Sequence, residues 1–181
     1  ELCRTQAGSN NGYSMPRDMT VDIADSPETF MGGWANPWDL SDLQKDMRDS
    51  VAELTRIRKT YLADVAAEFF TGRLDLGTQR KDIAWFSLGG HEMNEAHWAD
   101  GEKRSLTVQI EAGPDRGLLL LLNSATEETA FTLPDEKWGT SFRRIFDASS
   151  PVETHQPIIE LLAAKVKVAP HCAQVWLVTR S

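Results

Sequence analysis

The sequence predicts a mainly β protein, an antiparallel β-sandwich preceded by an irregular loop and one long amphipathic helix. Three observations lead to this prediction. From Glu1 to about Pro37 the chain is rich in Gly, Asn, Ser, Pro and Asp and has no hydrophobic period. A stretch with helical spacing follows, and after "FFTGR" the spacing changes to short alternating segments separated by turns.

The helix is expected between the paired-Trp segment "WANPW" and "FFTGR". Its apolar side chains recur every three or four residues, which places them on one face of a helix. Ser41 and Gln44 have the spacing of a capping box, in which the hydroxyl and the amide satisfy free N–H groups of the first turn. The apolar positions are Leu43, Met47, Val51, Leu54, Ile57, Tyr61 and Leu62.

About seven short strands are expected after the helix, at the spacing typical of a sandwich of two antiparallel sheets. The run "GLLLLLN" is apolar on both faces, as expected of a central strand. "PIIELLAA" fits either a helical turn or a strand. The predicted strands are "DIAWFSL", "SLTVQIE", "GLLLLLN", "TAFTLP", "FRRIFDAS", "AKVKVAP" and "CAQVWLVTR".

Composition and charge exclude several classes of partner. A formal net charge of −8 disfavours nucleic acids and anionic membrane surfaces, which select for clustered Lys and Arg. The longest apolar run, Leu118 to Leu122, is far too short to cross a bilayer, and no secretory signal is recognised. We therefore expect a soluble cytoplasmic protein. Cys3 and Cys172 could form one disulfide, but reduced thiols are the expected state.

Candidate metal and nucleophilic sites are weak in this sequence. In "HEMNEAHW" the residue four positions after His91 is Glu95, so His91, Glu92 and His97 do not match the helical zinc-protease spacing. We expect a polar connecting loop held to the sandwich by Met93 and Trp98, with no metal. His171 and Cys172 begin a strand, where alternation would point their side chains to opposite faces. No cofactor is expected.

Acidic and aromatic residues each allow a functional and a structural interpretation. Paired carboxylates on rigid supports would indicate a glycosidase, but Asp18, Asp22, Asp25 and Glu28 follow one another along an irregular loop, which favours solvated surface. Exposed tryptophans could stack on sugar rings, whereas core or interface positions are the expected role of each. The tryptophans are Trp34, Trp38, Trp85, Trp98, Trp138 and Trp176.

Several motifs together resemble one family. "ELCRTQAGSNNGY" is similar to the loop after the eighth barrel strand of bacterial glycogen debranching enzymes, the isoamylase-like branch of the alpha-amylase superfamily, in which "GDE-x-x-RTQ-x-G-x-NN-x-Y" recurs. "WANPWDLSDLQKDM" resembles the segment that leads into the eighth barrel helix, and "LTRIRKTY" resembles the end of that helix. "KDIAWFSLGGHEMNEAHWADGEKRSLTVQI" and "LLLLLNSATEETAFTLP" then follow the C-terminal sheet domain in order.

The resemblance implies a (β/α)8 barrel of which residues 1–70 are the last loop and helix, followed by a C-terminal antiparallel β-sandwich at 71–181. Arg4, Asn10, Asn11 and Tyr13 would face the glucan cleft, unless they only fix the loop backbone. The family run after Tyr13 is replaced by "SMPRDMTVDIADSPETFMGG", so no role is transferred beyond that Tyr.

The activity that the resemblance implies is retaining hydrolysis of α-1,6-glucosidic branches in glycogen or limit dextrin. The family's nucleophilic Asp, acid/base Glu and stabilising Asp come from earlier barrel strands and have no counterpart here, so no catalytic residue is assigned and this chain is expected to be inactive alone. The alternatives are a non-catalytic glucan-binding module and a purely structural domain. A helix face uncovered by the barrel would dock on the sandwich or promote self-association.

Overall fold

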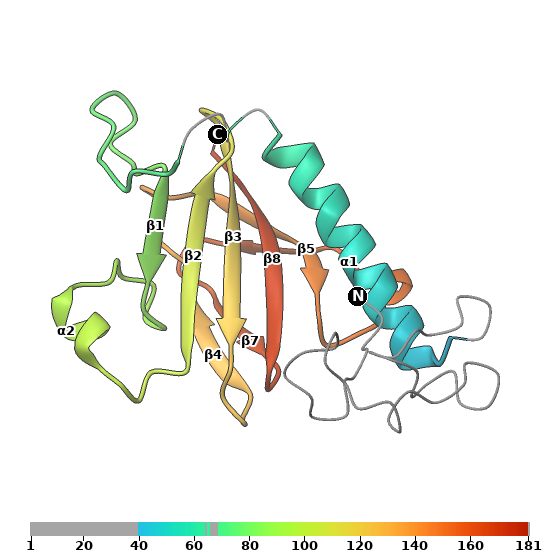
Figure 1. Cartoon of the computed structure of the whole chain (residues 1–181). Coiled ribbons are helices and arrows are strands. Elements are labelled where there is room, and N and C mark those ends of the chain that lie inside the picture. Colours follow the sequence, from blue (N-terminus) through green and yellow to red (C-terminus); the bar gives the residue numbers. More distant parts are fainter. Residues whose placement is uncertain (1–39, 64, 66–68, 181) are drawn as a thin grey trace, which may run out of the picture. The chain divides into compact units, whose positions relative to one another are not determined.

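The computed structural model of the chain describes residues 40–63, 65 and 69–180 (Figure 1). The fold divides into two compact units, Glu1–Ala52 and Glu53–Ser181, and the sheets described below all belong to the second. The expected loop over residues 1–37 lies outside the described residues. The elements are α1 Asp42–Tyr61, β1 Ile83–Phe86, α2 Glu95–Ala99, β2 Ser105–Glu111, β3 Arg116–Asn123, β4 Thr129–Thr132, β5 Ser141–Asp147, the 3-10 helix η3 Val152–Thr154, β6 Ile158–Leu161, β7 Lys165–Val168 and β8 Cys172–Thr179.

Helix α1 begins with the predicted capping box. The Ser41 N–H donates to Oε1 of Gln44 at 3.0 Å, and the Gln44 N–H donates to Oγ of Ser41 at 3.3 Å. The first turn carries Asp42 and the last turn carries Arg58 and Lys59, so charges of both signs complement the helix dipole. No described helix has the length and apolarity needed to cross a membrane.

The strands form two antiparallel sheets, as predicted. The larger sheet has the order β1-β2-β3-β8-β5-β6, and β4 pairs with β7 in a two-stranded sheet (Figure 1). Strand β3 lies inside the large sheet, where Leu120 pairs with Val108 of β2 and with Val175 of β8. The ambiguous "PIIELLAA" contains strand β6, which pairs with β5 at the edge of the large sheet.

The main core lies between the two sheets, so the fold is a sandwich. Leu119 and Leu121 of β3 are fully buried there, together with Phe131 of β4 and Val168 of β7. Trp176 of β8 adds the largest buried side chain and is 1% exposed. Alternate residues of the central strand therefore fill the space between the sheets, as the period of a strand requires.

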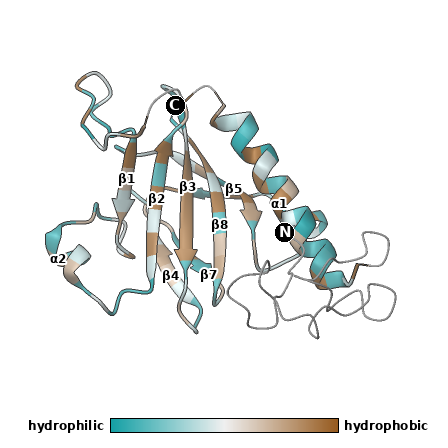
Figure 2. Ribbon diagram, in the orientation of Figure 1, coloured by the Kyte–Doolittle hydropathy of each residue, from teal (hydrophilic) through white to brown (hydrophobic). Residues whose placement is uncertain are grey.

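The opposite face of the large sheet carries a second apolar cluster. Ile57 of α1 is 3% exposed and packs with Leu118, Phe146 and Val175. Both faces of β3 are covered at this point, which agrees with the apolar run Leu118–Leu122 and with the brown colour of the strand in Figure 2. The part of α1 from Glu53 onward thus docks on the sandwich. Leu54 lies on the predicted apolar face but is 39% exposed.

Candidate ligand-binding site

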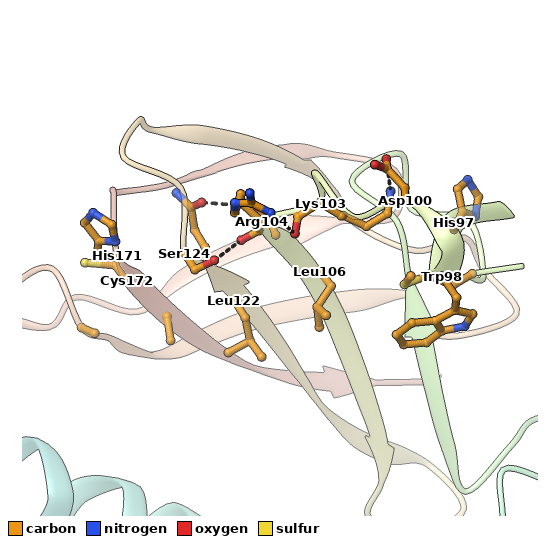
Figure 3. Close-up of a pocket in the computed structure, with 15 residues that line it drawn as sticks. His97, Trp98, Asp100, Lys103, Arg104, Leu106, Leu122, Ser124, His171 and Cys172 are labelled. Atoms are coloured by element: carbon orange, nitrogen blue, oxygen red, sulfur yellow. Dashed lines mark hydrogen bonds and ion pairs between the residues drawn. The ribbon is translucent and has the colours of Figure 1, made fainter. Parts of the chain in front are cut away.

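A pocket of about 620 Å³ opens where one end of β2, β3 and β8 meets the segment that contains α2 (Figure 3). Leu106, Leu122 and Ala173 are paired across the three strands and form an apolar row on one face of the sheet. Figure 3 shows the side chains of Leu106, Leu122 and Trp98 on the same side of the strands. The face is the one on which Ile57 packs, because Leu118 and Leu122 are four positions apart along β3 and alternate residues share a face.

The short helix α2 places Trp98 beside the sheet. Asn94 caps the helix: its side chain accepts from the His97 N–H at 3.0 Å, and the Asn94 N–H donates to Nδ1 of His97 at 3.3 Å. The Met93 N–H donates to the Trp85 carbonyl at 2.7 Å and joins this segment to β1. Trp98 consequently meets Trp85 edge to face, with ring centroids 5.7 Å apart and an interplanar angle of 72°.

The four described tryptophans divide into two kinds. Trp138 and Trp176 are 4% and 1% exposed, which confirms the predicted core role for these two. Trp85 and Trp98 are 37% and 54% exposed, so neither is a core residue, and the interface position that the prediction also allowed stays a prediction. Trp34 and Trp38 lie outside the described residues. An exposed aromatic pair beside an apolar pocket is a feature typical of binding surfaces.

Polar groups form the rim of the pocket, and most of them make hydrogen bonds or ion pairs with neighbouring groups. Oδ1 of Asp100 accepts from the Glu102 N–H at 3.0 Å, and Nζ of Lys103 lies 3.6 Å from Oδ2 of Asp100. Arg104 lies 3.6 Å from the carboxylate of Glu102, and the Arg104 carbonyl accepts from Oγ of Ser124 at 2.6 Å. Each rim cation therefore has a carboxylate neighbour.

His171 and Cys172 are both lining residues of this pocket, and the Cys172 side chain packs against the core between the two sheets. The alternation does not extend to His171, because its φ of +52° places it in the left-handed region just before β8. Burial and the nearby Asp147 carboxylate raise the pKa of the Cys172 thiol. The thiol is therefore neutral near pH 7 and is a poor nucleophile. Cys3 lies outside the described residues, so the reduced state of the two thiols stays a prediction.

The "HEMNEAHW" segment is a connection between β1 and β2, as predicted, although it also contains α2. Glu92 is ion-paired with Lys81, and Nδ1 of His97 is occupied by the Asn94 N–H. Within the described ranges, no group of three or more His, Cys, Asp or Glu side chains is arranged to hold a metal ion. Of the two predicted anchors, Met93 is half-buried and Trp98 is exposed.

Each of three pockets in the described part of the chain is lined by a single acidic residue. The first pocket is lined by one acidic residue, Asp100. A second pocket of about 420 Å³ contains Glu53, and a smaller one of about 140 Å³ contains Glu92. Retaining glycosidases need two carboxyl groups about 5–5.5 Å apart. The predicted cleft residues Arg4, Asn10, Asn11 and Tyr13 lie outside the described residues.

Comparison with known proteins gives a family match over the sandwich. Residues 82–181 match the family model described as "Isoamylase, C-terminal". The "Glycogen operon protein GlgX homolog" of Mycobacterium bovis and that of Mycobacterium tuberculosis are each 25% identical over 165 residues, covering 84% of this chain and 21% of the relative. The chain thus spans about a fifth of the length of these curated relatives.

Two solved structures also align with part of the chain. The family 44 endoglucanase Cel44A of Clostridium thermocellum is 18% identical with a TM-score of 0.32, covering 44% of this chain and 17% of that one. A family 44 xyloglucanase of Paenibacillus polymyxa is 20% identical with a TM-score of 0.32, covering 43% and 17%. Scores of this size do not establish a shared fold.

Proposed function

The chain belongs to the isoamylase C-terminal family, and from this premise we propose that it is the C-terminal part of a glycogen debranching enzyme. The whole enzyme hydrolyses α-1,6-glucosidic branches of glycogen or limit dextrin, in the retaining manner of a two-carboxylate glycosidase. The observation that carries the proposal is the family match, which covers more than half of the chain and extends over the β-sandwich. The similarity to the two glycogen operon proteins supports glucan as the substrate.

This chain does not carry out the hydrolysis by itself. A retaining mechanism needs a nucleophilic carboxylate and a second carboxyl group that protonates the leaving oxygen. The 620 Å³ pocket has Asp100 as its acidic lining residue, and that carboxylate accepts from the Glu102 N–H and faces Lys103. We assign the catalytic carboxylates to the part of the enzyme outside these 181 residues.

Activity on limit dextrin tests both parts of the proposal. The gene product that contains this sequence should release linear maltooligosaccharides, and the 181-residue chain should release none above a boiled control. Release by the short chain would overturn its assignment as a non-catalytic part. A gene product that is folded but inactive on every α-1,6-linked glucan would overturn the assignment to debranching.

The division into the end of a barrel at 1–70 and a sandwich at 71–181 is part of the same proposal. Limited proteolysis tests it, since a domain boundary is cut faster than the elements on either side. Cleavage near residue 70 should leave a protected fragment that contains all eight strands. Rapid cleavage between β2 and β8 would contradict this division.

A glucan-binding role of the sandwich is the second candidate, and the exposure of Trp85 and Trp98 favours it over a purely structural role. A structural domain gains more from tryptophans that are buried, because their large apolar surface then leaves water. Affinity electrophoresis of the chain with and without glycogen in the gel separates the two roles. Retardation by glycogen indicates binding, and equal mobility indicates a structural role.

A further inference from the structure

The open part of the large sheet carries apolar surface that no described element covers. Trp85 pairs with Val108, Leu106 pairs with Leu122, and these side chains share one face because their positions alternate along the paired strands. Trp85 is 37% exposed and Leu122 is 36% exposed, although both would gain free energy from burial. Trp98 stands beside them on α2 and is the most exposed of the three.

Trp98 is held in place on a framework that is itself well bonded. The reciprocal Asn94 and His97 hydrogen bonds fix the start of α2, and the Trp85 ring contacts Trp98 edge to face. Trp98 is a lining residue of both the 620 Å³ pocket and the 140 Å³ pocket. A rigid exposed ring of this kind presents a contact area at little cost in side-chain entropy.

Hydrogen-bonding capacity remains on the polar side of the pocket. His171 is a lining residue of the pocket, and its imidazole makes no hydrogen bond to any residue that the structure describes. Nδ1 of His97 accepts from the Asn94 N–H, which leaves Nε2 as a donor. The pocket therefore combines an apolar floor, one aromatic ring and separate donors and acceptors, which is the composition of a small-molecule site.

The charges of the rim favour an uncharged ligand. Lys103 faces Asp100, and Arg104 faces Glu102 while Nη1 of Arg104 donates to the Gly101 carbonyl at 2.9 Å. Because both cations already have anionic neighbours, a phosphate group would have to displace a carboxylate. A pyranose ring has no charge, has an apolar face of C–H groups that suits the negative face of an indole, and has hydroxyl groups at its edge.

We propose that the pocket lined by Trp98, Leu106 and Leu122 binds a segment of α-1,4-linked glucan, with one glucose ring stacked on Trp98 and hydroxyl groups directed to His171 and Asp100. The choice of an α-linked glucan rests on the proposed function, whereas the position of the site rests on the pocket. Bound there, a chain of glycogen is held by a surface that has no part in bond cleavage. Trp85 is a positioning residue that supports the Trp98 ring.

Binding of maltoheptaose to the 181-residue chain tests the proposal, with Trp98→Ala as the variant. Loss of the stacked ring should weaken binding by about tenfold, since aromatic contacts and the apolar area beneath them are lost together. Phe69→Ala is the matched control, because Phe69 is a 97% exposed aromatic residue that does not line the pocket. This control should bind within about twofold of the unmodified chain.

Amide hydrogen exchange locates the bound sugar independently of the Trp98 variant. The segment from His97 to Leu106 contributes much of the pocket lining, so maltoheptaose should slow amide exchange in peptides from this segment, measured by mass spectrometry. Adenosine monophosphate and cellohexaose serve as an anionic and a β-linked probe, and neither should slow this exchange at the same concentration. Unchanged urea midpoints of the variants establish that binding, rather than folding, has been altered.

Three results would overturn the proposal: no binding of maltoheptaose, equal binding by the Trp98→Ala variant, or stronger protection by adenosine monophosphate than by maltoheptaose. The debranching activity of the gene product is measured alongside. If the gene product debranches limit dextrin and the chain does not bind maltoheptaose, the pocket proposal alone is wrong. If binding occurs at Trp98 and the gene product is inactive, the pocket proposal holds and the assignment to debranching fails.

Discussion

Replacement of Asn123 by alanine should destabilise the sandwich more than any other change of one polar side chain considered for this chain. Asn123 ends β3, is 3% exposed and connects strands of both sheets. Its Nδ2 lies 3.1 Å from the Val168 carbonyl and 3.0 Å from the Ala169 carbonyl. Its Oδ1 accepts from Oγ of Ser105 at 2.7 Å and from the Ala125 N–H at 3.1 Å.

The expected loss follows from the groups that would stay buried without a partner. Two of the hydrogen bonds, those to Ser105 and to the Val168 carbonyl, are enclosed by protein, whereas the other groups reach partly exposed positions. A buried group left unpaired costs about 1–3 kcal/mol. The free energy of unfolding should therefore fall by about 2–4 kcal/mol, and Tm by about 5–15 °C for a chain of this size.

Asn123→Asp makes the same argument dependent on pH. The substitution places a carboxylate oxygen where Nδ2 faces the Val168 and Ala169 carbonyls, which raises the pKa of the introduced carboxyl in the folded state. A raised folded pKa means that the folded variant binds its proton more tightly than the unfolded chain does. The stability deficit is thus largest above the folded pKa and shrinks as the pH falls toward about 4.

Urea unfolding at pH 7 and pH 5, followed by tryptophan fluorescence, measures both effects. Asn94→Asp is the matched control, because an aspartate at this exposed N-cap keeps the acceptor for the His97 N–H and should change stability by less than about 0.5 kcal/mol. The reasoning is refuted if Asn123→Ala unfolds within about 0.5 kcal/mol of the unmodified chain. A deficit of Asn123→Asp that is the same at both pH values would refute the electrostatic part.

Two further predictions concern α1 and the segment that precedes β1. Ile57→Ala should lower the free energy of unfolding by about 2–4 kcal/mol and speed amide exchange from Glu53 to Tyr61. Leu54→Ala, at a 39% exposed position, should lower it by less than half as much. Equal losses of stability would contradict docking of α1 through Ile57. Partial burial raises the pKa of Asp82, but hydrogen bonds from the N–H groups of Thr71 and Gly72 outweigh it and lower the pKa overall. The stabilisation by the Asp82 carboxylate is present above its unfolded pKa and is lost as the pH falls through its folded pKa. Asp82→Asn should therefore destabilise the chain at pH 7 and have little effect near pH 2, measured by urea unfolding. An equal loss of stability at both pH values would exclude the carboxylate as the cause.

The order and bounds of most elements could be predicted from local patterns. Strand β2 occupies Ser105–Glu111, the residues of the predicted "SLTVQIE", because turns limit an alternating run at both ends. The capping box of Ser41 and Gln44 was predictable for the same reason, since it depends on residues three positions apart. The fold class follows from the number and spacing of such runs.

The burial of individual side chains was harder to predict from the sequence, because it depends on partners that lie far along the chain. Thr107 and Gln109 are each 1% exposed although they are the polar residues of an alternating strand. Nε2 of Gln109 donates to the Trp138 carbonyl at 2.9 Å, a partner from a loop 29 positions away, whereas its Oε1 has no hydrogen-bond partner among the described residues. The edge strand β6 was ambiguous because its residues are apolar on both faces and it has a single neighbour, β5.

The candidate site was missed because it is defined by exposure. The sequence identified Trp98 as an anchor of its loop, and the structure retains the contact with Trp85 but leaves more than half of the Trp98 surface open. No local pattern distinguishes an exposed tryptophan from a buried one, since the outcome depends on what covers that part of the sheet. A polar helix start, Asn94 with His97, directly before an aromatic residue is the signal that could have placed Trp98 on a short surface helix.

The two halves of the outer sheet face differ in a way that bears on their roles. Where α1 covers the sheet, Ile57 meets Leu118, Val175 and Leu177 in a cluster made of apolar residues. Where the sheet is open, the apolar row ends against Asp100, Lys103 and other polar groups. If another protein domain packed on this surface, those polar groups would lose their water or would have to form hydrogen bonds with groups of that domain. A hydrated sugar chain satisfies them directly, which is why the open half suits glucan better than a packed domain.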